Sequence, residues 1–228
     1  MSQDLCNWFT KSCKKKAKPI EPLIPKLDID NIPLSESADK LTPVPIPKPR
    51  PLSTFSPNKT TITVFTDGST INNGKRAEIV KGGVGVFFGK NDGRNISKKV
   101  VAKKVTNNVC ELMACILAIE TVLNTQETMN FIEIVIYSDS EYTINSIVKW
   151  ANNWEKNEYC KKVNGKLIPV KNQLYIKKLH EYYKKYNIKF YHVKAHKSAP
   201  DANKYPEKYK LWYGNYMADQ LARCASEN

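Results

Sequence analysis

The sequence predicts an α/β domain of mixed strand and helix order behind a proline-rich arm. Apolar residues follow strand spacing in the segments 61–66, 83–89, 96–105, 131–138 and 188–194. They follow helical spacing in the segments 110–124, 140–153, 172–186 and 214–226. Three strands are thus followed by a helix, a strand, two helices, a strand and a last helix, an order typical of mixed α/β folds.

The individual elements have clear signals. The first strand, TITVFT, is rich in β-branched residues, and the fourth, FIEIVIYS, is a continuous apolar run. The second and third, GGVGVFFGK and ISKKVVAKKV, are short and flanked by basic residues, as in an antiparallel meander. Ser140 and Asn172 precede the second and third helices, where an N-cap residue is expected.

Residues 1–58 differ in composition from the rest of the chain. They contain ten of the thirteen prolines, including the run PVPIPKPRP. Such a stretch favours extended polyproline conformations, so we expect a disordered arm. Residues 59–228 are then the folded domain. The arm carries +3 of the formal net charge of +14, so the basic character belongs mainly to the domain.

The composition narrows the class of function. A chain with a pI near 9.4 is expected to bind an acidic partner, first of all nucleic acid, and the alternative is a merely soluble basic protein. No apolar run approaches the ~20 residues of a membrane span, and the start lacks the apolar core of a secretory signal. Six cysteines without a C-x-x-C pair argue against zinc and against a disulfide framework. We expect a monomer inside the cell, in the nucleus or cytoplasm, that is not secreted and binds no membrane.

Four carboxylates stand at positions where a charge is costly to bury. Asp67 and Asp139 follow two apolar strands, while Glu111 and Asp219 share the apolar faces of two helices. If the two strands pair in parallel, both aspartates emerge at one edge of the sheet. Each aspartate alone could be a turn residue or a helix cap. Together the four predict a site for two hard divalent ions, Mg²⁺ or Mn²⁺.

Five segments in chain order resemble motifs of ribonuclease H type 1. They are FTDGST, the glutamate of NNVCELMACILAIE, YSDSEYTINSI, HVKAH and GNYMADQLA. The resemblance runs from about residue 61 to residue 225. It implies a ribonuclease H-like fold with a five-stranded mixed sheet and helices on both faces. It also implies cleavage of the RNA strand of RNA–DNA hybrids with two magnesium ions, leaving 5′-phosphate and 3′-hydroxyl ends. By this resemblance the metal ligands are Asp67, Glu111, Asp139 and Asp219.

The histidines receive different interpretations. By the resemblance, His196 matches a mobile histidine that assists proton transfer or product release. His192 alternates with Val193 along a strand and is interpreted as structural, and His180 is interpreted as a surface residue of its helix. The segment 197–213 between His196 and Asp219 is longer than in a typical member of the family. It is expected to be a loop that acts as a lid, contacts the substrate or is an insertion without a function of its own.

The resemblance also assigns contacts with both strands of a hybrid. The residues expected to contact RNA hydroxyls are Asn73, Asn107 and Asn108, which are otherwise typical turn formers. Aromatic residues interleaved with lysines after residue 141 are expected to line a channel for the DNA strand, although either tryptophan alone could belong to the core. The residues assigned to the DNA strand and its phosphate pocket are Lys104, Thr106, Tyr142, Trp150, Trp154, Lys161, Lys162 and Asn172.

Two other functions remain open at this point. A nuclease of the same fold could act on another substrate, as a resolvase does, or a binding module could keep the fold without catalysis. The arm carries one further candidate, because Leu5, Trp8 and Phe9 share one face of a helical turn. They resemble a degenerate peptide that binds a sliding clamp. The alternatives are a chance cluster or an anchor that folds back onto the domain.

Overall fold

The computed structural model describes residues 60–71, 80–102, 105–126, 129, 131–195 and 197–227. The predicted arm, with Leu5, Trp8 and Phe9, lies outside the described residues, as do Asn73, Lys104 and His196. The strands are β1 (Thr60–Ile71), β2 (Val80–Phe87), β3 (Ile96–Ala102), β4 (Ile132–Ser138), β5 (Cys160–Val163), β6 (Lys166–Pro169) and β7 (Ile188–His192). The helices are α2 (Asn107–Thr125), α3 (Glu141–Asn145), the π-helix η1 (Ser146–Trp150), α4 (Ala151–Glu155), α5 (Gln173–Lys185) and α6 (Pro206–Glu227).

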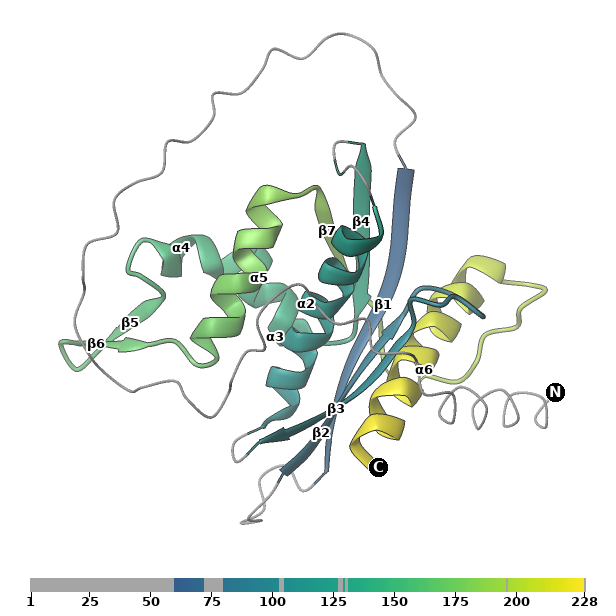
Figure 1. Cartoon of the computed structure of the whole chain (residues 1–228), viewed down its shortest axis with the longest axis horizontal. Coiled ribbons are helices and arrows are strands. Elements are labelled where there is room, and N and C mark those ends of the chain that lie inside the picture. The colour runs from purple at the N-terminus through teal and green to yellow at the C-terminus, as the bar shows by residue number, and fades with distance from the viewer. Residues whose placement is uncertain are drawn as a thin grey trace, which may run out of the picture. The chain divides into compact units, whose positions relative to one another are not determined.

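The main sheet has five strands in the order β3-β2-β1-β4-β7 (Figure 1). β1, β4 and β7 run parallel, whereas β1–β2 and β2–β3 are antiparallel, as the meander predicted. The rings of Phe65, Tyr137 and Tyr191 stack across the three parallel strands, with centroids 5.1 Å and 5.5 Å apart. The predicted five-stranded mixed sheet is therefore confirmed.

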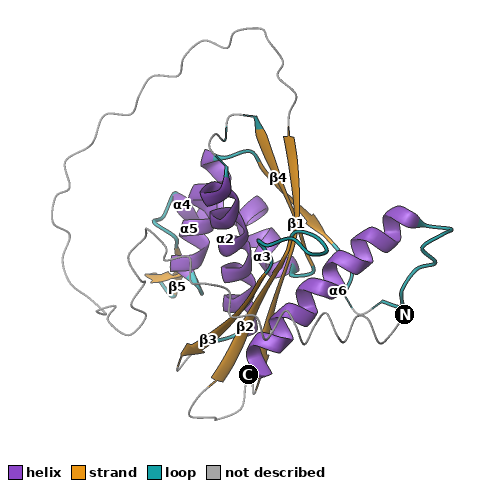
Figure 2. Ribbon diagram, turned by 45° about the vertical axis from the view of Figure 1, so that its right-hand side comes forward, coloured by secondary structure: helices purple, strands orange, loops and turns teal. Residues whose placement is uncertain are grey.

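Helices cover both faces of this sheet (Figure 2). α2 packs on β1 and β2 with α5 beside it, and α6 packs on β1, β2 and β3 from the other side. Among the described residues α2 alone has the length and the mean hydropathy, 1.3, of a membrane-crossing helix. By length and composition, α2 therefore departs from the expectation that no apolar segment approaches a membrane span. Leu112, Ile119 and Val122 are fully buried in the core, and this packing accounts for the apolar composition of α2.

Several elements differ from the prediction. The helix expected over 140–153 is interrupted by η1, and β5 and β6 form a hairpin that was not expected. Ser140 does cap its helix, accepting a hydrogen bond from the Thr143 backbone N–H at 3.2 Å. Asn172 makes no side-chain cap: its backbone is left-handed (φ 61°), and its Nδ2 donates to the Tyr142 hydroxyl.

The helix predicted to start at residue 214 starts at Pro206 instead. Proline fits the first turn of a helix, where its missing N–H has no partner to lose. Gly214 therefore lies inside the helix, and a Cβ there would lie 2.3 Å from the Phe65 ring. Of the segment expected to be a loop, 206–213 is helical, and this adds two turns to α6 beyond the predicted start.

Candidate active site

Parallel pairing of β1 with β4 brings two aspartates together at the edge of the sheet. The last paired residues are Thr66 and Ser138, so Asp67 and Asp139 follow at equivalent positions. β4 ends there, but β1 continues to Ile71 against β2. Asp67 thus lies inside a strand rather than at its end, and its side chain is only 5% exposed. This corrects the expectation of a strand end, because the Asp67 backbone is also paired with Gly85 of β2.

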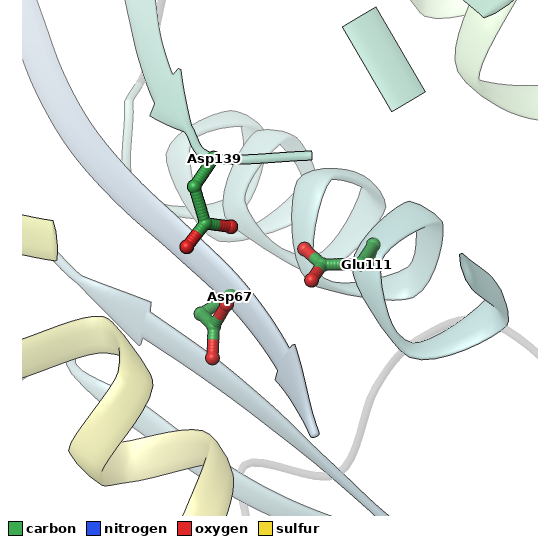
Figure 3. Close-up of side chains that lie close together, drawn as sticks. All are labelled: Asp67, Glu111 and Asp139. Carbon is green, nitrogen blue, oxygen red and sulfur yellow. The ribbon is translucent and has the colours of Figure 1, made fainter. Parts of the chain in front are cut away.

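Helix α2 adds the third carboxylate from its first turns. Thr106 caps this helix by accepting a 3.4 Å hydrogen bond from the Val109 backbone N–H. The helix approaches β1 so closely that a Cβ on Gly68 would lie 2.3 Å from the Glu111 backbone nitrogen. Only glycine leaves room for this contact. It places Glu111, 4% exposed, against the two aspartates (Figure 3).

Asp67, Glu111 and Asp139 form a compact oxygen cluster. Each offers a carboxylate oxygen within 4.8 Å of the others. Burial, followed by repulsion from Asp139 and Asp219, raises the pKa of Asp67 well above its usual value. Burial, followed by repulsion from Asp67 and Asp139, does the same to the pKa of Glu111. The cluster thus holds more negative charge than its surroundings neutralise.

Asp219 reaches the same pocket from α6. A Cβ on Gly85 of β2 would lie 2.1 Å from the Ala218 carbonyl oxygen, so glycine lets α6 lie directly on the sheet. Asp219 pairs with Arg223 one turn later, Nε to Oδ1 2.9 Å. One turn earlier, Asn215 donates from Nδ2 to Asp139 Oδ2 over 3.5 Å. Asp219 lines the pocket but does not belong to the compact cluster of three.

The pocket has the chemistry of a divalent cation site. Its volume is about 440 Å³, and all four predicted carboxylates line it. Glu111 Oε2 is buried and has no hydrogen-bond partner among the described residues. A buried carboxylate oxygen without a donor is stabilised by a cation, and oxygen-only ligands suit Mg²⁺ or Mn²⁺. The residues present therefore fit such an ion.

A family model described as RNase H matches residues 59–227. The chain belongs to the RNase H family. This family depends generally on metal ions, in agreement with the buried acidic cluster.

The region that matches this chain is only part of each curated relative. The chain is 43% identical to Ribonuclease H of Schizosaccharomyces pombe over 48% of this chain and 36% of that protein. It is 35% identical to Ribonuclease H1 of Homo sapiens over 46% of this chain and 34% of that protein. It is 41% identical to Ribonuclease H of Haemophilus influenzae over 49% of this chain and 63% of that protein. The chain thus matches about a third of the first two relatives.

Solved structures share the ribonuclease H-like fold. LC9-RNase H1, described as a type 1 RNase H with the type 2 active-site motif, has a TM-score of 0.51 at 20% identity, covering 73% of this chain and 72% of that one. The PFV RNase H domain has a TM-score of 0.50 at 20% identity, covering 72% of this chain and 93% of that one. At this identity the likeness concerns the fold alone.

Two of the three asparagines assigned to RNA line the acidic pocket of this RNase H domain. Asn107 donates from Nδ2 to Glu111 Oε1 at 3.3 Å and accepts from Thr70 Oγ1 at 3.5 Å. Asn108 lies beside it on the same rim. Both belong to the first turn of α2 rather than to a turn between elements, so the turn-former alternative does not apply to them.

Apart from the two tryptophans, the described residues assigned to the DNA strand lie in three places: at the acidic pocket, on the hairpin and at the start of α2. Tyr142 lines the acidic pocket, and its hydroxyl accepts from Asn172 Nδ2 at 3.1 Å. Lys161 and Lys162 are exposed on β5, within a segment, residues 150–171, that we call the basic protrusion. Thr106 serves as the cap of α2, whatever else it contacts.

The two tryptophans also belong to the basic protrusion, but they differ in exposure. Trp150 is 41% exposed, whereas Trp154 is half-buried against the core. Their ring centroids are 5.6 Å apart. The alternative that one tryptophan belongs to the core therefore holds in part for Trp154.

The structure corrects the interpretation of His180 as a surface residue. Its side chain is fully buried. Nδ1 lies 2.7 Å from the Tyr159 hydroxyl and Nε2 3.1 Å from Asn152 Oδ1. It thus connects α5 to two points of the basic protrusion, Asn152 of α4 and Tyr159. His192 is the last residue of β7 and is exposed.

Further polar residues around the pocket were not among the predicted site residues. Ser69, Thr70, Asn215 and Arg223 line it or contact its carboxylates. Helical spacing could have identified two of them, because Asn215 and Arg223 lie four residues before and after Asp219.

Proposed function

We propose that this chain is an endonuclease that hydrolyses the RNA strand of RNA–DNA hybrids, using two magnesium ions held by its carboxylates. The observation that carries the proposal is the convergence of four carboxylates from β1, α2, α6 and the end of β4 on one pocket. The names of the curated relatives, Ribonuclease H and Ribonuclease H1, support it.

Asp67, Glu111, Asp139 and Asp219 would hold the ions. When bound, divalent cations supply the charge that activates a water molecule and stabilises the leaving oxygen of a phosphodiester. The chain's own residues fix the ligands. Asn107 orients Glu111, Asn215 orients Asp139, and Arg223 holds Asp219 through its ion pair.

The choice of RNA as the cut strand rests on the polar rim of the same pocket. A 2′-hydroxyl both donates and accepts hydrogen bonds, and it distinguishes RNA from DNA. Ser69, Thr70, Asn107 and Asn108 place small hydroxyl and amide groups beside the carboxylates. Such groups can reach a sugar hydroxyl next to the bond to be cut. They favour a hybrid nuclease over a resolvase or a binding module.

The test is a gel assay with four labelled 18-mers: hybrid, double-stranded RNA, double-stranded DNA and single-stranded RNA, each with magnesium or with EDTA. We expect cleavage of the hybrid alone, in its RNA strand and only with magnesium. Cleavage of DNA, or hybrid cleavage that persists in EDTA, would overturn the proposal.

Thermal unfolding gives a readout independent of activity. An ion that binds only the folded state stabilises it by RT ln(1 + [L]/Kd). Magnesium should therefore raise the Tm of the wild type, and this rise should shrink in Glu111→Gln, which removes a ligand. An equal rise in both proteins would place the ion elsewhere.

A further inference from the structure

A second hollow opens beside the acidic pocket and shares Asp139 and Asp219 with it. Its volume is about 600 Å³, and it lies between α6 and the chain that follows β7; we call it the α6 groove. The residues that α6 contributes all lie on one helical face: Lys208, Leu211, Trp212, Asn215, Tyr216 and Asp219. Lys208, Leu211 and Trp212 belong to the two turns of α6 that precede its predicted start.

One wall of the groove is aromatic. The rings of Trp212 and Tyr216 are nearly parallel, 13° apart, with centroids separated by 5.3 Å. Trp212 donates from Nε1 to the Lys197 carbonyl oxygen at 2.8 Å, which ties the helix to the opposite wall. Tyr216 remains 41% exposed. The groove thus presents a fixed aromatic surface to solvent.

Most of the other lining side chains are basic or apolar, and His192 and Ser198 add two further polar groups. Lys194, Lys197 and Lys208 provide positive charge, opposed by Asp139 and Asp219, the two carboxylates that the groove shares with the acidic pocket. Between them the surface is mostly apolar, with Val193, Ala195, Ala199, Pro200 and Leu211. Lysines that attract phosphates beside apolar and aromatic surface for bases are the features of a single-strand binding groove.

We propose that the α6 groove binds a single-stranded segment of the RNA strand that continues from the hybrid. The inference rests on the proposed function, because the strand that enters the groove must be the one whose phosphate lies at Asp139 and Asp219. Bases inside a hybrid are paired and stacked on each other, whereas unpaired bases can stack on aromatic side chains. From Asp219 to Lys208 the helix rises about 16 Å, enough for four or five stacked nucleotides at about 3.4 Å each.

The experiment compares the affinities of hybrids with different ends. Binding is followed by fluorescence anisotropy in the Glu111→Gln background, which lacks a proposed metal ligand outside the groove. The ligands are one blunt 18-base-pair hybrid and the same hybrid with six extra nucleotides at the RNA 5′ end, the RNA 3′ end or either end of the DNA strand. We expect one RNA extension to tighten binding about tenfold, as stacking of one or two bases does, and the DNA extensions to add little.

Groove variants identify where the extension binds. Tyr216→Ala should remove most of this gain, whereas Tyr216→Phe, which keeps the ring, should retain it. Lys194→Ala with Lys208→Ala should lower the salt dependence of the gain by about 0.7 per lost phosphate contact. The matched control is Lys177→Ala with Lys185→Ala on α5, which removes equal charge outside the groove and should leave the gain unchanged.

The outcomes separate this inference from the proposed function. If wild-type protein cuts the blunt hybrid but no RNA extension tightens binding, the groove inference is wrong and the nuclease proposal stands. Equal gains from DNA extensions, or a gain that survives both Tyr216→Ala and the lysine pair, would also overturn it. Failure to cut any hybrid would count against the nuclease proposal itself.

Discussion

The acidic pocket and the basic protrusion differ in how their functional residues are supported. Asp67 and Glu111 are less than 6% exposed and lie on elements packed into the core. Lys161 and Lys162 are exposed on β5 of a two-stranded hairpin that does not belong to the main sheet (Figure 1), and Trp150 is 41% exposed. Catalysis needs ligands fixed to fractions of an ångström, whereas contact with a phosphate backbone tolerates longer and more mobile side chains.

The same difference appears in the electrostatics of the two regions. The carboxylates are buried together, so each destabilises the others until a cation binds. The lysines are exposed and cost the fold little, because water solvates them. Neutralising a pocket carboxylate should therefore change catalysis and folding stability in opposite directions, while removing the exposed lysines of the protrusion should change binding alone.

The largest effect is expected from Asp67→Asn. The amide keeps the shape of the side chain but loses the charge that would hold the metal, so cleavage in the gel assay should be abolished while hybrid binding persists. Because the change also relieves repulsion with Asp139 and Asp219, unfolding in EDTA should require at least as much urea as in the wild type. Asp139→Asn should likewise abolish cleavage.

Asp92→Asn is the control, since Asp92 pairs with Arg94 in the β2–β3 connection, outside the pocket. It should leave cleavage unchanged. Substantial turnover in Asp67→Asn would contradict the assignment of Asp67 as a metal ligand.

Gly68→Ala should damage folding and catalysis together. The new Cβ would lie 2.3 Å from the Glu111 nitrogen and 2.6 Å from the Cys110 carbonyl carbon, both backbone atoms that cannot move without shifting α2. Overpacking of this kind costs roughly 2–3 kcal/mol of unfolding free energy, measured by urea titration. Gly93→Ala, where an added Cβ meets no atom within 4 Å, should cost almost nothing. Similar losses in both variants would mean that α2 does not depend on this close contact.

Lys161→Ala with Lys162→Ala should weaken hybrid binding without loss of stability. Each lost phosphate contact should reduce the log–log salt slope by about one unit. Trp154 is better left intact in this experiment, because it packs partly against the core and its loss would confuse binding with folding. An unchanged slope in anisotropy titrations would mean that the hairpin does not touch the substrate.

The four carboxylates were predictable because each is a charged residue among apolar neighbours in the sequence. An apolar strand that runs into an aspartate, or a helix that turns a glutamate toward its apolar face, signals a buried charge from a few neighbouring residues. Parallel pairing then brought Asp67 and Asp139 together, as expected. Their distances from Glu111 could not be predicted, since they depend on how closely α2 approaches Gly68.

The α6 groove and His180 were not predictable, because both depend on contacts with residues far away in the sequence. Gly214 looked like a helix boundary, and only the Phe65 ring packed against it explains a glycine inside α6. His180 stands among lysines and tyrosines in LHEYYKKY, a context typical of a solvated helix face. Its burial depends on Tyr159 and Asn152, which lie 21 and 28 residues away in the sequence. The roles of His196, Asn73, Lys104 and the arm stay predictions, because those residues lie outside the described part of the chain.

The smallest predicted effect concerns the buried contact that holds the basic protrusion to α5. Burial lowers the pKa of His180 below its usual 6.5, and the neutral ring accepts from the Tyr159 hydroxyl while it donates to Asn152 Oδ1. The unfolded chain therefore binds a proton more readily than the folded one. The contribution of neutral His180 to stability is complete above pH 6.5. It is lost as the pH falls from 6.5 through the pKa of His180 in the folded state, by at most about 1.4 kcal/mol per pH unit.

The measurement is the difference in unfolding free energy between wild type and His180→Gln, taken from pH 8 to pH 5 in EDTA. A difference is needed because Asp67 and Glu111, whose pKa values are raised, gain folded-state protons as the pH falls and so oppose the slope in both proteins. The wild type should lose stability relative to His180→Gln below pH 6.5. Tyr159→Phe keeps the imidazole but leaves Nδ1 without its donor, which costs about 1–3 kcal/mol at neutral pH. If the difference between wild type and His180→Gln does not change with pH, His180 does not couple folding to protonation, and the protrusion is held by packing alone.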